Sequence, residues 1–146
     1  MVIKIKDNHY NSYMANLKEL DSKKVAVGLL KSAGQDLVNI GVANEFGVKS
    51  QNIPKRSFIR STFNKNKRKV RSEFRKIFRS FKKSRINVKT KLKEIGLTQE
   101  KNIKKTIYTL KTPPNAPYTI EKKGFDNPLI ETGKMYRSIS YQIRKK

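Results

Sequence analysis

The chain has 146 residues, of which 36% are hydrophobic, and it carries 35 basic against 11 acidic side chains, a net charge of +24. This length predicts a single domain over residues 1–146. The absence of cysteine excludes disulfides, thiolate metal sites and cysteine nucleophiles. The longest apolar run, residues 25–30, is far shorter than the roughly 20 residues of a membrane span, so we expect no membrane segment. We also expect no signal peptide.

The positive charge is concentrated in the middle of the chain. Residues 54–93 hold 17 basic and 1 acidic side chains, whereas residues 1–53 have a net charge of only +2 and residues 94–146 of +6. A field of this strength repels other copies of itself and attracts polyanions. The expected partners of the central region are therefore DNA or an acidic protein surface.

Periodicity in the first third of the chain predicts short elements. Residues 2–6 alternate and predict a strand, and residues 10–20 have the apolar spacing of a helix. Residues 24–30 are β-branched and apolar, which indicates a buried strand.

A second helix is predicted over about residues 37–46. Asp36 is a good N-cap residue for it. Gly47 stands where a left-handed residue commonly ends a helix.

A long basic amphipathic helix is predicted over about residues 57–84. Its charged faces offer few acid–base pairs at i,i+4, so packing of an apolar stripe must stabilise it. That stripe, at a spacing near 3.5 residues, consists of Phe63, Val70, Phe74, Ile77, Phe78 and Phe81.

A second long helix is predicted over residues 88–110, with a break or kink near Gly96 and Thr98. A Pro-rich loop over about 111–130 should be extended, because its prolines disfavour helix. The C-terminal residues 137–144 alternate and predict a half-buried strand.

These elements predict an α+β fold. We expect a small, mostly antiparallel sheet of three to four strands, including residues 2–6, 24–30 and 137–144, packed against the two long helices.

Catalytic patterns are missing. His9 is the only histidine, and the acidic residues form no DxD, ExxE or HExxH pattern. Phosphate-cradling glycine motifs are absent as well, and no base accompanies the serines. We therefore predict that the chain is not an enzyme and uses no cofactor or metal.

The basic helix is the sharpest chemical signal. Three interpretations stay open: a solvated face, contact with an acidic neighbouring subunit, or salt-sensitive contact with the DNA backbone. No motif for reading bases accompanies it. The candidate surface consists of Arg60, Lys65, Lys67, Arg68, Lys69, Arg71, Arg75, Lys76, Arg79, Lys82 and Lys83, with Arg85 beyond it.

Three separated segments carry a family resemblance. They are VAVGL at 25–29, then IGVANEFG at 40–47 with IPKRSFIR at 53–60, and finally PPNAP at 113–117 with TIEKKG, PLIETG and SISY up to residue 141. In this order they resemble the tail-completion, or head–tail joining, proteins of tailed bacteriophages. Ser57 and Met135 depart from the family pattern, which has Pro and commonly Leu. The matching positions are Asn44, Glu45, Phe46, Gly47, Pro54, Arg56, Phe58, Pro117, Thr119, Gly124, Pro128, Leu129, Thr132 and Gly133.

The resemblance implies a structural virion protein that acts by binding. Such a protein forms a homo-oligomeric ring at the phage neck and joins the head connector to the tail, after assembly in the bacterial cytoplasm. Its partners would be portal or connector proteins and the tail terminator or tail tube, and packaged DNA is a further candidate. We expect Glu45 to be held by backbone donors, Phe46 to be buried, and Arg56 and Arg60 to pair with acids of the same or an adjacent subunit. The alternatives are a non-specific nucleic-acid-binding protein and an assembly chaperone.

Overall fold

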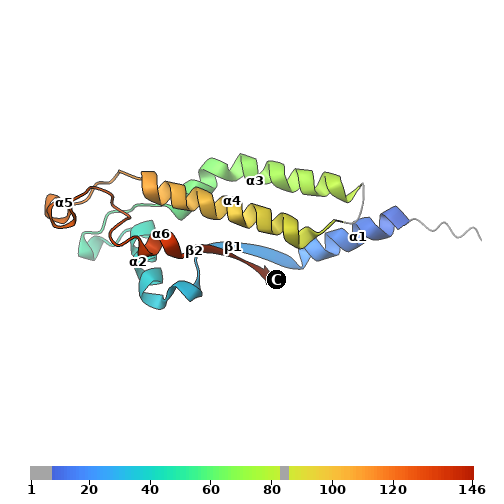
Figure 1. Ribbon diagram of the computed structural model, residues 1–146, viewed down its shortest axis with the longest axis horizontal. Coiled ribbons are helices and arrows are strands. Elements are labelled where there is room, and N and C mark those ends of the chain that lie inside the picture. Colours follow the sequence, from blue (N-terminus) through green and yellow to red (C-terminus); the bar gives the residue numbers. More distant parts are fainter. Residues whose placement is uncertain (1–7, 83–85) are drawn as a thin grey trace, which may run out of the picture.

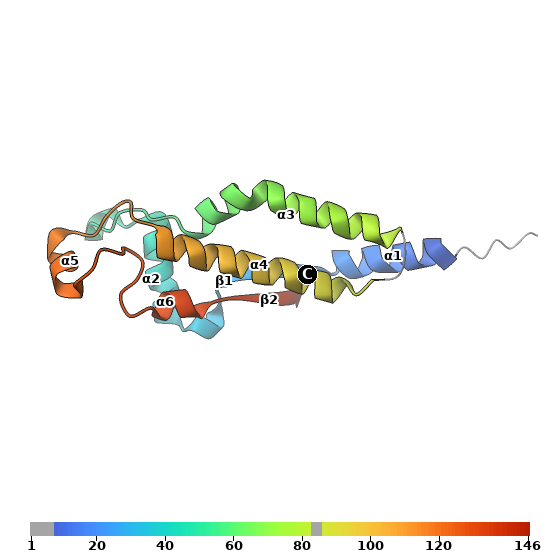
Figure 2. The ribbon, with the colours of Figure 1, turned by 45° about the horizontal axis from the view of Figure 1, so that its top comes forward.

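The two strongest apolar periodicities form two long helices that lie along each other, α3 (Ile59–Phe81) and α4 (Val88–Thr109). The computed structural model describes residues 8–82 and 86–146. Helix α4 occupies the middle of the molecule, with α3 on one side and a small sheet on the other (Figures 1 and 2). The remaining elements are α1 (Asn8–Asp21), β1 (Lys23–Leu29), α2 (Gln35–Phe46), α5 (Pro117–Lys123), α6 (Lys134–Ser138) and β2 (Ile139–Lys145), with short 3-10 turns at Lys31–Ala33 and Lys49–Gln51.

The sheet is smaller than predicted. Its two strands, β1 and β2, pair antiparallel from Lys23 opposite Lys145 to Leu29 opposite Ile139. Three to four strands were expected, but the described part of the chain forms only these two, and the predicted strand at 2–6 lies outside it. The α+β class is therefore confirmed in its coarse form, with mostly helices and one small antiparallel sheet.

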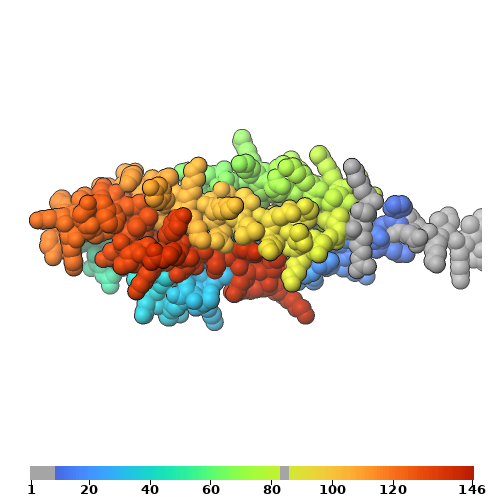
Figure 3. Space-filling model, in the orientation of Figure 1, coloured from blue at the N-terminus to red at the C-terminus, as the bar shows by residue number. Residues whose placement is uncertain are grey.

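The hydrophobic core is divided into two clusters along α4. One lies toward the C-terminal half of α4 and includes Phe58, Ile103, Ile107, Leu129, Met135 and Ile139. The other lies toward its N-terminal half and includes Ile77, Phe81, Val88, Leu92 and Ile95. Because α4 bridges both clusters, the molecule is elongated, with the orange α5 region at one end and the blue α1 at the other (Figure 3).

The apolar stripe of α3 is only partly buried. Ile77 and Phe81 are buried as predicted, but Phe63 is 51% exposed and Phe78 42% exposed. The helix is anchored near its two ends. The Thr62 hydroxyl donates to the Thr106 hydroxyl at 2.6 Å near the start. Near the other end, Ile77 and Phe81 join the core, so the middle of the stripe stays open.

Helix α4 is continuous, so the predicted break near Gly96 and Thr98 is wrong. A Cβ at Gly96 would lie 2.4 Å from Cδ2 of Tyr141, which shows that this glycine makes room for an aromatic ring of β2. The Thr98 hydroxyl donates to the carbonyl oxygen of Glu94 at 2.9 Å, one turn earlier, instead of capping a new helix.

Helix α2 and the Pro-rich region over 111–130 also differ from prediction. Helix α2 begins at Gln35 after Gly34, so Asp36 lies in its first turn and is not the N-cap. Gly47 ends α2 as expected, and its N–H donates to the carbonyl oxygen of Ala43. Its φ of 78° is positive, but its ψ of 157° lies outside the left-handed helical region. The region 111–130 was predicted to be extended, and this prediction is wrong over Pro117–Lys123, which form α5. Pro117 stands in the first turn of this helix, where a missing N–H costs no hydrogen bond.

Candidate functional site

Glu45 provides the N-terminal cap of the basic helix. Its carboxylate is buried and accepts the backbone N–H groups of Phe58 at 2.8 Å, Ile59 at 2.9 Å and Arg60 at 3.0 Å. The hydroxyl of Ser57 donates to it at 2.7 Å. Since the first N–H groups of a helix have no partner within it, one carboxylate satisfies three of them and complements the helix dipole. The expectation for Glu45 is confirmed.

Arg56 connects the same corner to the Pro-rich loop. Its Nε donates to the carbonyl oxygen of Pro113 at 2.9 Å, and its Nη2 donates to that of Pro114 at 2.7 Å. Burial lowers the pKa of Arg56, and the negative charge of Asp126 opposes that shift. The guanidinium therefore binds carbonyl oxygens across 57 and 58 residues of sequence, and it forms no ion pair with an acid of the described part of its own chain.

Asn115 and Asn127 hold the rest of this loop. The Asn115 side-chain oxygen accepts from Arg56 at 3.4 Å, and its amide nitrogen is buried without a hydrogen-bond partner. The Asn127 side chain donates to the carbonyl oxygen of Tyr108 at 2.8 Å and accepts from the N–H of Leu129 at 3.2 Å. Both asparagines are buried.

The remaining family motif positions serve the backbone and the core. The carbonyl oxygen of Asn44 accepts the N–H of Arg56 at 2.7 Å. Phe58 and Leu129 are core residues. Gly124 ends α5 and Gly133 begins α6, both with φ 73°. Pro54, Pro117, Thr119, Pro128 and Thr132 lie in the connecting segments or helix ends.

Phe46 departs from the expectation that it is buried. Its ring is 58% exposed, and the guanidinium carbon of Arg60 lies 5.0 Å from the ring centroid. Arg60 therefore stacks on an aromatic face, and this cation–π contact leaves both side chains on the outer surface beside the start of α3.

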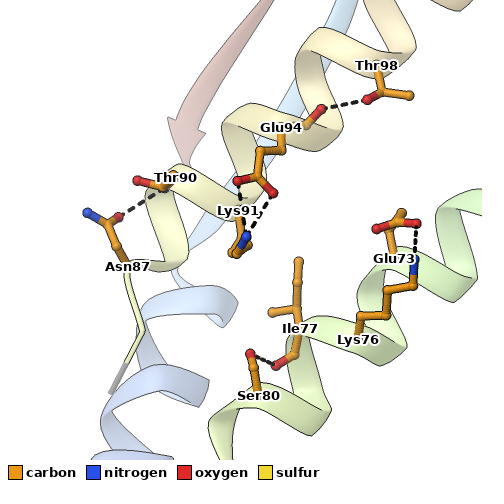
Figure 4. Close-up of polar contacts among 9 residues, drawn as sticks. All are labelled: Glu73, Lys76, Ile77, Ser80, Asn87, Thr90, Lys91, Glu94 and Thr98. Carbon is orange, nitrogen blue, oxygen red and sulfur yellow. Dashed lines mark hydrogen bonds and ion pairs between the residues drawn. The ribbon is translucent and has the colours of Figure 1, made fainter. Parts of the chain in front are cut away.

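The cations predicted on α3 are exposed as far as the structure describes them. Within α3, the carboxylate of Glu73 pairs with Lys76 at 2.9 Å. Facing it across the helix pair, Lys91 pairs with Glu94 on α4 (Figure 4). Lys83 and Arg85 lie outside the described residues. The exposed set is Arg60, Lys65, Lys67, Arg68, Lys69, Arg71, Arg75, Lys76, Arg79 and Lys82.

An apolar groove of about 700 Å³ lies beside this cationic face. Its floor includes Leu92 and Ile95 of α4, and its wall includes Phe63, Phe74 and Phe78 of α3. The sequence missed this groove, because periodicity places these phenylalanines on one stripe but does not tell how much of that stripe another element covers.

Within residues 8–82 and 86–146, no group of three His, Asp or Glu side chains is placed to hold a metal ion. No helix in the same ranges combines the length and hydropathy of a membrane span. The buried polar side chains described above hold backbone groups in place. This arrangement fixes the positions of the surrounding surfaces, which suits a role in binding.

Comparison with protein-family models, curated proteins and solved structures finds no significant match to this chain.

Proposed function

We propose that the chain is a structural protein of the bacteriophage neck, forming a homo-oligomeric ring that joins the head connector to the tail during assembly. The observation that supports this most is the meeting of the second and third resembling segments at one corner. Glu45 of the second segment caps α3, and Arg56 binds the carbonyl oxygens of the third. The motif residues thus form one structural unit.

This unit fixes two surfaces relative to each other. One is the cationic face of α3, and the other is the 111–130 region, where Tyr118 and Phe125 are exposed at the end of the molecule. Ring subunits need two different surfaces that bind each other head to tail until the ring closes. An elongated subunit with two rigidly connected surfaces meets that requirement, and its action is binding without turnover.

The direct test is cryo-electron microscopy of virions that encode this chain, focused on the neck. We expect a ring of this chain between portal and tail. Intact particles without the chain would overturn the proposal and favour the assembly chaperone.

The second candidate is a non-specific nucleic-acid-binding protein. The observation favouring it is the row of exposed cations on α3, which has a single acidic residue, Glu73. It predicts duplex binding by the isolated protein with a steep decrease of log K with log salt. Binding that is weak and independent of salt would exclude it.

A further inference from the structure

The apolar groove is bordered by an edge of β1 with which no strand of residues 8–82 and 86–146 pairs. The N–H of Lys146 donates to the carbonyl oxygen of Ser22 at 3.0 Å, just beyond the first residue pair of the sheet. Antiparallel pairs alternate between hydrogen-bonded and non-bonded. Lys23, Val25 and Val27 therefore direct their N–H and C=O groups away from β2. These three residues line the groove, whereas no residue of β2 itself does.

Helix α3 runs along this groove and is held by contacts near both of its ends. Near its first residue, Ile59 Cδ1 lies 3.4 Å from where a Cβ on Gly28 of β1 would stand. At its end, Phe81 meets Tyr13 of α1 edge to face, with ring centroids 6.2 Å apart. The distance along α3 between these two contacts is roughly 33 Å at ~1.5 Å per residue. A seven-residue strand needs only about 23 Å, so a strand beside β1 fits lengthwise.

Cations border the groove on both sides. Each residue of an α-helix is rotated by ~100° from the one before it. Around α3, Lys67 and Arg71 therefore lie next to Phe63 and Phe74, on the side away from the core. Both are exposed, as is Lys24 on the β1 side. The acidic residue in the groove lining, Asp21, pairs with Lys146 at 2.6 Å. An occupant that covers the apolar floor therefore places its own flanking side chains next to positive charge.

A second copy of the chain does not provide such a segment. Its 11 acidic residues are scattered along the sequence, and no extended stretch of it alternates apolar and acidic side chains. Glu19 and Asp21 alternate with Leu20, but they lie within α1. Duplex DNA satisfies the cations but presents no apolar face to the exposed rings of Phe63 and Phe78.

We propose that this groove binds an extended segment of a partner protein in which apolar and acidic residues alternate. The segment adds a third strand to the free edge of β1, with its apolar side chains on the groove floor and its carboxylates beside Lys24, Lys67 and Arg71. Main-chain hydrogen bonds at a sheet edge give such complexes affinity, and alternate side chains give specificity. This deepens the proposed function by naming the chemistry of a neck neighbour, and it rests on that function for the identity of the neighbour.

The test uses the full chain and a fluorescein-labelled ten-residue peptide of alternating Val and Glu, with a Val and Lys peptide of the same length for comparison. We expect the Glu peptide to bind roughly tenfold more tightly, since several rim contacts contribute together. We also expect slower amide hydrogen exchange at Val25 and Val27 in the complex.

Two matched variants separate the groove rim from the rest of α3. K67E/R71E should weaken binding of the Glu peptide by about tenfold. K65E/R79E makes the same change of charge on the opposite face of the helix and should alter binding less than about threefold. Thermal unfolding by circular dichroism confirms that both variants are folded; should K67E/R71E fail to fold, K24E on β1 takes its place.

Each contrary result overturns the proposal. Absence of binding at millimolar peptide, equal weakening by both variants, or unchanged exchange at Val25 and Val27 refutes the added strand. If duplex DNA competes with the peptide, and both variants weaken DNA binding equally, the surface binds nucleic acid instead. The neck function is tested independently. If the chain binds the peptide but is absent from particles, only the ring is refuted. If the chain is present in particles but does not bind the peptide, only the groove proposal is refuted.

Discussion

Replacing Glu45 by Gln tests whether one carboxylate holds the basic helix in place. The substitution keeps the shape of the side chain but replaces one acceptor oxygen with an NH₂ group that faces backbone donors. In the native chain the carboxylate accepts three backbone N–H groups and the Ser57 hydroxyl, at 2.7 to 3.0 Å. Oε2 accepts from Phe58 and Ile59, and Oε1 accepts from Arg60 and the Ser57 hydroxyl, so either orientation of the glutamine amide leaves at least one backbone N–H without its acceptor.

The expected loss follows from these contacts. An unsatisfied buried N–H costs about 1–3 kcal/mol, and loss of a helix cap costs about 0.5–2 kcal/mol. Because these contributions overlap, we expect E45Q to lower the free energy of unfolding by roughly 2–3 kcal/mol. The midpoint of thermal unfolding should fall by about 5–10 °C. Urea unfolding followed by circular dichroism at pH 7 measures the change.

E73Q is the matched control. Glu73 lies on the same helix and pairs with Lys76, but both side chains are about half exposed or more, so this pair contributes at most ~1 kcal/mol. If E45Q costs no more than E73Q, the carboxylate does not hold α3, and the argument that links the motif to the helix is wrong.

Three further predictions follow from the same structure. R56K should destabilise the chain by about 2 kcal/mol and speed proteolysis within 111–130, because a lysine does not reach two carbonyl oxygens at once; unchanged proteolysis contradicts the link to the loop. G96A should lower the free energy of unfolding by about 1–2 kcal/mol, although alanine favours helix. In the Y141L background, where the ring is absent, the same G96A substitution should stabilise the chain; stabilisation by G96A in the native background would show that the Tyr141 ring can move aside. Charge reversal along Lys67–Lys83, whose last residue lies outside the described ranges, should leave circular dichroism unchanged but prevent incorporation into particles, and normal infectious particles would refute that role.

Local physical chemistry made several features predictable. The helical spacing of apolar residues located α3 and α4, alternation located β2, and Gly47 marked the end of α2. The exposure of the cations on α3 followed from their number, because so many charges have too few acidic partners to be buried. That backbone donors hold Glu45 was also foreseen, but not that they belong to the start of α3, which lies 13 to 15 positions later.

Other features depend on contacts between residues far apart in sequence. Gly96 was predicted to break α4, but it makes room for Tyr141, 45 positions later. Arg56 has a charge that suggests an acidic partner, yet it binds the carbonyl oxygens of Pro113 and Pro114.

What the sequence by itself determined is the four helices α1 to α4, the C-terminal strand and the concentration of charge, because each depends on residues within a few turns of one another. The tertiary structure alone decided which side of α3 stays open. Phe63 and Phe81 occupy the same angular position on the helix, yet one is 51% exposed and the other 1%. The difference arises because α1 covers the end of α3, and no element of the described chain covers its middle.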